Sequence, residues 1–221
     1  MIDRHSCLCA HCWSKVYFIP PPVQKNINDI GLSADENNED VIEEDCGLTH
    51  IRSVTAYCDI SCVLVRLLKY HDRGDLAIMM AQWMFRIGKD FIIDSDVIIA
   101  VPLHRFRLIR RQYNQSAELA RLIAHYGKKP FLPGVLVRNR NTKPQVDLSI
   151  SSRKKNLCNA FCVQKKNEKY IRGLKILLVD DVYTTGSTAH SATMALKRAG
   201  AMNIRVITFA RSLKQSSSSV I

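Results

Sequence analysis

The chain has 221 residues, 47% of them hydrophobic, which is enough to bury one core and a small appendage. No apolar run is long enough to span a membrane and the first residues lack the apolar core of a signal peptide, so the sequence indicates a cytoplasmic protein without membrane insertion. The formal net charge of +12 points to anionic partners, and eight cysteines in a reducing compartment indicate thiols or metal ligands, which excludes a disulfide framework.

Residues 1–26 are Cys-rich and contain one of the two Cys-x-x-Cys pairs that a zinc site with four cysteines needs. Cys9 and Cys12 form a Cys-x-x-Cys pair, but Cys46 has no second cysteine at that spacing. A structural zinc site takes four ligands in a tetrahedron, so bound zinc would need a further thiol or imidazole. The nearby candidates are Cys7, His5, His11 and His50. Zinc binding and a metal-free segment both remain open, and the spacing favours the metal-free form.

Residues 27–53 are predicted to be an acidic linker. The main part, Asp29–Asp45, contains eight acids and no Lys or Arg, a composition typical of a disordered or loosely attached segment. Removing these eight acids from the 20 in the chain leaves 12 against 32 Lys and Arg, a formal +20. The remainder of the chain is therefore strongly basic, which suits phosphorylated ligands or nucleic acid.

From residue 54 to residue 213, strand-like and helix-like segments alternate. Strands are expected from Val54 and over residues 97–101, 131–137, 161–163, 175–180 and 204–210, and helices over residues 60–69, 75–87, 114–125 and 188–199. This order predicts one α/β domain with a mostly parallel sheet flanked by helices. Residues 214–221 are predicted to be a polar tail.

An arginine-rich loop follows the strand expected over residues 97–101. Between Pro102 and the helix that begins near Asn114, the chain carries Arg105, Arg107, Arg110 and Arg111. Arginine binds phosphate oxygens through a planar pair of donors, so this loop is a candidate anion site. A second loop, residues 139–152, is polar and contains Lys143 and Pro144, which is typical of a mobile segment able to close over a ligand.

Residues Leu174–Ala199 carry the most informative pattern. The apolar run Ile176–Val179 is typical of a strand buried on both faces, and Asp180 and Asp181 follow it at the edge where α/β sheets bind ligands. A Thr/Gly/Ser loop, residues 184–188, then precedes a helix whose first amides and dipole favour a phosphate. Carboxylates beside such a loop can accept hydrogen bonds from ribose hydroxyls, so the pattern predicts a sugar-phosphate site. A buried strand with an ordinary capped helix would not explain the paired acids, and the Lys of a nucleotide P-loop is absent.

The stretch LKILLVDDVYTTGST resembles the phosphoribosyl pyrophosphate (PRPP) signature of type I phosphoribosyltransferases. Two further stretches, DVIIAVPLHRFRLIRRQYNQSAELA from Asp96 and RNRNTKPQVDLSISSRKKNLCNAFCV from Arg138, resemble the ComF/GntX branch of that family. The second stretch matches the branch at Arg138, Thr142, Gln145, Leu148, Ser149, Arg153, Asn156, Ala160 and Phe161. The sequence departs from the branch at Gln112, which stands where the branch has glycine.

The resemblance implies an α/β type I phosphoribosyltransferase fold and a role for each matched residue. Asp180 and Asp181 are expected to be catalytic by contacting the ribose hydroxyls. PRPP is expected to bind at Val179, Thr184, Thr185, Gly186, Ser187 and Thr188. Its pyrophosphate is expected at Pro102, Leu103, His104, Arg105, Arg110 and Arg111, with a cis peptide before Pro102. The flexible loop is expected to contribute Arg138, Thr142, Lys143 and Gln145. The Cys-rich segment then resembles a degenerate zinc ribbon, with Cys9, Cys12 and Cys46 as its metal ligands.

Two functions of different classes follow from the resemblance. The first is a ComF-type phosphoribosyltransferase that binds PRPP with Mg²⁺ and transfers the phosphoribosyl group to an unknown nitrogen acceptor. The alternative is a non-catalytic competence or DNA-uptake factor that binds single-stranded DNA. Basic charge favours this alternative, whereas an aromatic content of 7% argues against binding by base stacking. Zn²⁺ as a second metal and a homodimer as the assembly both stay open.

Overall fold

The computed structural model describes residues 2–3, 7–20, 50–69, 74–103, 108, 113–138 and 160–213. Its centre is a parallel sheet of four strands in the order β3 (His50–Ala56), β8 (Asn203–Arg211), β7 (Lys175–Tyr183) and β4 (Val97–Ala100). All three neighbouring pairs run parallel. The predicted mostly parallel sheet is therefore confirmed. Strand β3 begins at His50, four residues before the expected start of the domain at Val54.

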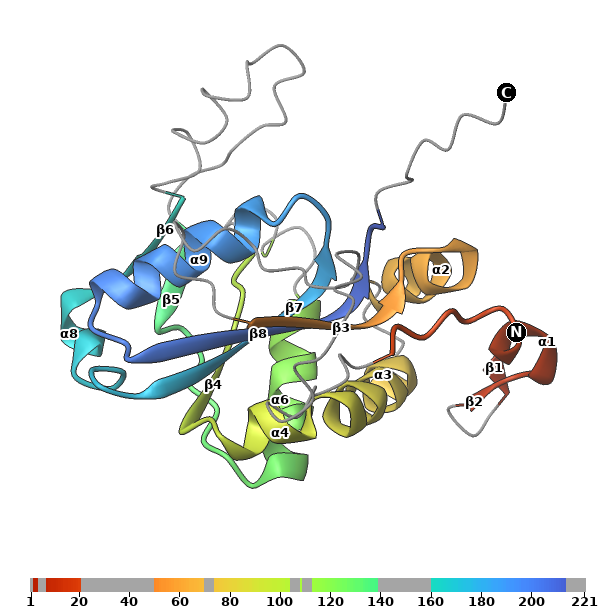
Figure 1. Ribbon diagram of the computed structural model, residues 1–221, viewed down its shortest axis with the longest axis horizontal. Helices are drawn as coiled ribbons and strands as arrows, with labels where there is room; N and C mark the ends of the chain where they lie inside the picture. The colour runs from red at the N-terminus through yellow and green to blue at the C-terminus, as the bar shows by residue number, and fades with distance from the viewer. Residues whose placement is uncertain are drawn as a thin grey trace, which may run out of the picture.

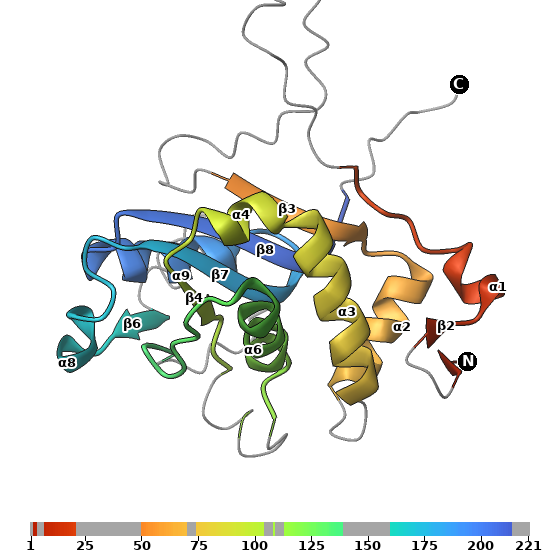
Figure 2. The same cartoon turned by 90° about the horizontal axis from the view of Figure 1, so that it is seen from below.

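Helices cover both faces of the sheet, as Figure 1 shows. On one face lie α2 (Asp59–Leu68), α3 (Gly74–Ile87), α4 (Lys89–Ile93) and α6 (Gln115–Gly127), and on the other lies α9 (Ser187–Arg198). Figure 2, seen from below, shows α3, α4 and α6 side by side in front of the strands. The described helices include none that is both long enough and apolar enough to cross a membrane.

Strand β7 is buried on both faces because it lies inside the sheet between two helical layers. Leu177 and Val179 belong to the core beneath α3 and α6, whereas Ile176 and Leu178 belong to the core beneath α9. Successive side chains of a strand point to opposite faces, so a strand covered on both sides has to be apolar throughout. This is the physical reason for the unbroken apolar run in the sequence.

A small antiparallel pair lies beside α9 and is formed by β5 (Leu136–Arg138) and β6 (Phe161–Val163), followed by the short α8 (Lys165–Glu168). The strand predicted over residues 131–137 is wrong in its first half. Phe131 makes only an isolated bridge to Ile98 of β4, and Gly134, with φ of 73°, turns the chain before β5 begins. A positive φ is compatible with glycine but interrupts a strand.

The amino-terminal segment docks on the edge of the sheet. It contains β1 (Ile2–Asp3), β2 (Cys7–Leu8) and α1 (Ala10–Trp13), and it then runs antiparallel to β3. The amide of Ile19 donates to the carbonyl of Val54 at 2.9 Å, and the amide of Ala56 donates to the carbonyl of Tyr17 at 2.9 Å. These bonds occupy main-chain groups of β3 that would otherwise form an open sheet edge.

Candidate active site

The paired acids lie within the last part of β7. This strand continues to Tyr183, three residues past its predicted end at Asp180, so both acids are part of the sheet. Asp180 is 9% exposed, and Asp181 is half-buried. Both acids nevertheless lie at the carboxyl ends of the parallel strands, where the sequence predicted the ligand site.

The first turn of α6 holds both acids. The Ser116 hydroxyl donates to Oδ1 of Asp180 at 2.9 Å, and the side-chain amide of Gln115 donates to Oδ2 of Asp181 at 2.9 Å. The amide of Asp181 also donates to Oδ1 of Asp180 at 2.9 Å. Gln115 and Ser116 were not among the predicted site residues. The signal for them was the Asn-Gln-Ser run at the start of the helix, directly after the arginine-rich loop.

Asn114 places this turn relative to β4. Its side-chain oxygen accepts from the amide of Ser116 at 3.2 Å, which caps α6, and its Nδ2 donates to the carbonyl of Val101 at 3.3 Å. The amide of Val101 in turn donates to the carbonyl of Val179 at 2.9 Å. The end of β4, the start of α6 and the acids of β7 are therefore joined by a continuous set of hydrogen bonds.

Burial and charge repulsion act together on the acid pair. Burial raises the pKa of Asp180 well above its usual range, and the neighbouring negative charge of Asp181 raises it further, while the Ser116 hydroxyl and the Asp181 amide oppose the shift. A ligand that brings hydroxyl donors or a cation to this position would favour the ionised form of the pair. The buried Oε1 of Gln115, which has no hydrogen-bond partner among the described residues, adds a neutral oxygen acceptor beside the pair. Oxygen donors of this kind suit Mg²⁺ and ribose hydroxyls.

Gly186 forms the turn between β7 and α9. Its φ is +76°, and it is the residue that caps α9. A Cβ atom at this position would lie 2.3 Å from the hydroxyl oxygen of Tyr183, so a larger residue is excluded by both backbone conformation and contact.

The hydroxyl groups of the loop lie around this turn. Those of Thr185 and Ser187 lie 2.9 Å apart, and Thr184 and Thr185 are exposed to solvent. Thr188 lies in the first turn of α9, where amides have no partner within the helix. The segment thus has the geometry of an anion site next to the acids.

The described part of the arginine-rich segment ends close to these acids. Pro102 and Leu103 follow β4 and are half-buried. The expected cis peptide before Pro102 is wrong, because no cis bond occurs in the described residues, which include this one. The remaining residues predicted to bind pyrophosphate lie outside the described residues; they are His104, Arg105, Arg110 and Arg111.

Arg138 is not a loop residue. It is the last residue of β5, pairs with Phe161 of β6, and its guanidinium carbon lies 5.4 Å from the centre of the Phe161 ring. Its assignment to the flexible loop is therefore corrected to a strand position. The other predicted loop residues, Thr142, Lys143 and Gln145, lie outside the described residues.

Cys9 and Cys12 lie together at the start of α1. Hydrogen bonds from the amide and thiol of Cys12 lower the pKa of the Cys9 thiol. Cys46 lies outside the described residues, and within the described ranges no three His, Cys, Asp or Glu side chains are grouped as a metal site. The pair has the Cys-x-x-Cys spacing of half a zinc site.

A family model matches more than half of this chain. The family model described as "Phosphoribosyl transferase domain" matches residues 96–219. The solved orotate phosphoribosyltransferase of Aeropyrum pernix aligns with 18% identity and a TM-score of 0.39 over 72% of this chain and 68% of its own.

Curated relatives extend the comparison. DNA utilization protein YhgH of Salmonella typhi is 35% identical over 73% of this chain and 71% of its own length. Competence protein F of Haemophilus influenzae is 39% identical over 52% of this chain and 50% of its own length. Competence protein ComFC of Bacillus subtilis is 28% identical over 73% of this chain and 64% of its own length. Because the family model matches more than half of the chain and a relative above 30% identity covers most of it, the chain belongs to the ComF family of phosphoribosyltransferase-like proteins.

Proposed function

We propose that this chain binds PRPP together with Mg²⁺ and transfers the phosphoribosyl group to a nitrogen acceptor. The observation that carries the proposal is the pair Asp180 and Asp181, held by the first turn of α6 beside the glycine turn at the start of α9. Ribose hydroxyls would donate to the two carboxylates, and the 5′-phosphate would accept from the amides and hydroxyls of residues 184–188.

The proposed reaction is displacement at ribose C1. The bond between the acceptor nitrogen and C1 forms, the bond between C1 and the pyrophosphate oxygen breaks, and the electron pair of that bond leaves with pyrophosphate. Positive charge develops on the ribose ring, and the carboxylates of Asp180 and Asp181 stabilise it through their negative charge. Ser116 and Gln115 keep the two carboxylates oriented toward the ribose. Bound Mg²⁺ would neutralise charge on the departing pyrophosphate, with Asp180, Asp181 and Oε1 of Gln115 as nearby protein oxygens.

Calorimetry with PRPP and Mg²⁺ tests the binding step. The double variant Asp180→Asn with Asp181→Asn should lose PRPP binding while its far-UV circular dichroism stays that of the wild type. The matched control is Glu168→Gln in α8, which also replaces an acid by its amide but lies in a different element. Equal affinity in the wild type and the double variant would remove the ribose role from the acids. Pyrophosphate release across a panel of bases and amines then identifies the acceptor.

A second candidate function is binding of single-stranded DNA. The names of two relatives, "DNA utilization protein YhgH" and "Competence protein F", favour it, as does the formal net charge of +12. Contacts through Arg105, Arg110 and Arg111 would be made to phosphates, so affinity should fall steeply with salt and depend little on base sequence. Because these arginines are the expected pyrophosphate ligands, millimolar PRPP should displace DNA bound there. Salt-insensitive binding would exclude this phosphate-based mode.

A further inference from the structure

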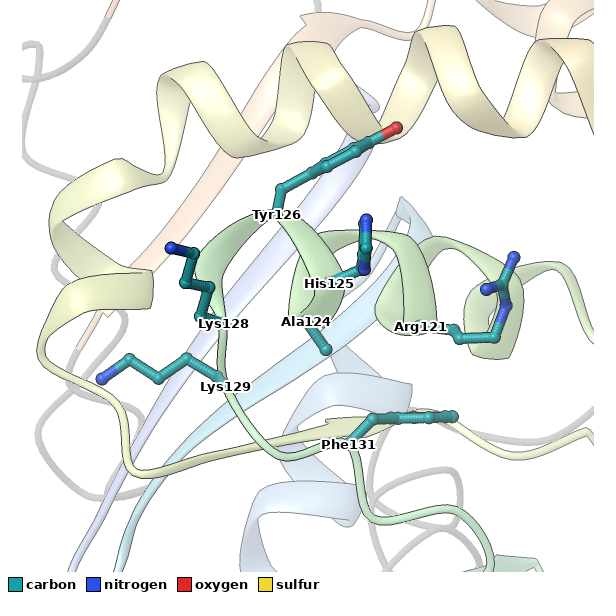
Figure 3. A pocket seen from close by; sticks show the side chains of 7 residues that line it. All are labelled: Arg121, Ala124, His125, Tyr126, Lys128, Lys129 and Phe131. Carbon is teal, nitrogen blue, oxygen red and sulfur yellow. The ribbon is translucent and has the colours of Figure 1, made fainter.

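An open pocket of about 720 Å³ lies along the carboxyl-terminal half of α6, away from the paired acids. Its lining consists of cationic and aromatic side chains with one alanine: Arg121, Ala124, His125, Tyr126, Lys128, Lys129 and Phe131. In Figure 3, Ala124 and His125 lie in the middle of this group, the two lysines lie at one end and Arg121 at the other. Residues 121 and 125 share one stripe of the helix because they are four positions apart, and Lys128 follows directly after the last helical residue.

The pocket has a cationic character that its surroundings only partly neutralise. No carboxylate belongs to the lining. Arg121 is paired with Glu118, and the ammonium group of Lys129 donates to the carbonyls of Ile93 and Ser95 at 2.8 and 2.6 Å. Lys128 is exposed, and its ammonium group has no acidic partner among the residues that the structure describes. One exposed cation at one end of the lining is therefore available to an anion.

Lys128 also adopts a backbone conformation that its residue type disfavours. Its φ is +51°, and among the described residues it is the only one other than glycine with a positive φ. Glycine or asparagine is the usual residue where a helix ends in the left-handed conformation. Because an unfavourable backbone conformation is often kept where a side chain has a function, Lys128 is a candidate ligand-binding residue.

Phe131 forms an aromatic wall on the side opposite the helix. The bonds on either side of it fix its position against β4: the amide of Ile98 donates to the carbonyl of Pro130 at 2.9 Å, and the amide of Leu132 donates to the carbonyl of Ile98 at 3.0 Å. Its ring is half-buried, so part of it faces the pocket. An aromatic ring placed in this way can stack with any nucleobase.

We propose that this pocket binds a nucleotide, with the phosphate on Lys128 and His125 and the base against Phe131. The volume lies within the range of about 300–1,000 Å³ typical of small-molecule sites. The last amides of α6 do not supply the anion contacts, because those of Lys128 and Lys129 donate to the carbonyls of His125 and Ala124. Side-chain cations therefore have to hold the phosphate. The lining begins at Arg121, about 9 Å along the helix from Gln115, and the proposed phosphate contact Lys128 lies about 20 Å from Gln115, so the phosphate would lie apart from the site proposed for PRPP.

The nucleotide can come from two sources, a free nucleotide or one unit of a single strand. Fluorescence anisotropy with a labelled deoxyoligonucleotide of about ten nucleotides measures the strand, and calorimetry with deoxyadenosine monophosphate measures the free nucleotide. Both are carried out on the full chain with millimolar PRPP and Mg²⁺ present, so that the site at Asp180 and Asp181 is occupied if it binds PRPP. Affinity for the strand far above that for the monophosphate identifies the strand as the source, whereas similar affinities identify the free nucleotide.

Lys128→Asn is the decisive variant, because asparagine tolerates the left-handed conformation and removes only the cation. Affinity should fall about tenfold and the dependence of affinity on salt should become shallower by about one phosphate contact. The matched control is Lys165→Asn, an exposed lysine of α8, which should bind as the wild type does. Phe131→Leu should weaken binding of the monophosphate but not of inorganic phosphate. Absence of binding by both probes at low salt, or equal affinity in Lys128→Asn and wild type, would overturn the proposal.

Discussion

At the scale of single residues, Asp180 is placed for binding at the expense of stability. Its carboxyl group is buried, accepts a hydrogen bond from Ser116 and adjoins a second acid. A protein selected for stability alone would put an uncharged side chain there, because burial of a charge without a cationic partner is unfavourable. Buried acids with strongly shifted pKa values occur frequently at functional sites. The acid pair is therefore better explained by a ligand than by the fold.

The shifted pKa of Asp180 predicts how stability depends on pH. Burial and the charge of Asp181 raise this pKa on folding, so the folded chain binds the proton more tightly than the unfolded chain. The contribution of Asp180 to stability is full below the ordinary carboxyl pKa and is lost as the pH rises through the raised value. Asp180→Asn should remove this loss of stability at higher pH. Near neutral pH, the variant should therefore unfold at a higher urea concentration than the wild type.

Urea unfolding at about pH 5 and about pH 8 measures this effect. Glu168→Gln serves as the control and should keep the pH dependence of the wild type, because Glu168 lies in α8 and is only half-buried. A lower stability of Asp180→Asn than of the wild type at about pH 8 would show that the carboxylate contributes to the fold.

At the scale of elements, the sequence predicted those features that depend on residues close together in the chain. The apolar run before Asp180 and the glycine turn before α9 were readable from the sequence, because burial on both faces and a positive φ each leave a direct mark on residue type. The contacts of Gln115 and Ser116 were not readable, since their partners are 66 and 64 residues away along the chain. The position of Arg138 was missed for the same reason, because β5 exists only through its pairing with β6.

The end of α6 yields a prediction about helix termination. Lys128 has a φ of +51°, which disfavours lysine and most other residues with a Cβ atom, so Lys128→Gly should raise the free energy of unfolding by about 0.5–1 kcal/mol. Gln82→Gly, at an exposed position inside α3, should instead lower it by about 1 kcal/mol. Chemical denaturation compares the two variants with the wild type. A loss of stability in Lys128→Gly would mean that the lysine side chain makes a stabilising contact.

At the scale of the whole molecule, the amino-terminal segment is more closely joined to the domain than its composition suggested. Besides its two main-chain bonds to β3, it brings Trp13 and Phe18 against Trp83 of α3, with ring centres 5.2 and 5.1 Å from that ring. Aromatic pairs at this separation stabilise contacts by about 0.5–1.5 kcal/mol each. These contacts join the segment to the domain. The sequence could not reveal them, because they join residues on either side of the acidic stretch.

Zinc content tests whether this segment is a metal module. Cys9 and Cys12 supply half of a tetrahedral site, and the segment is already held by main-chain bonds and aromatic contacts, so we expect the purified protein to contain well below one zinc per chain. A chelator should leave the unfolding temperature unchanged. Elemental analysis and thermal unfolding measure the two quantities, with Cys162→Ser, a thiol of β6, as the control substitution. One tightly bound zinc per chain that is lost in Cys9→Ser but kept in Cys162→Ser would show that other ligands complete the site and that the segment is a folded zinc module.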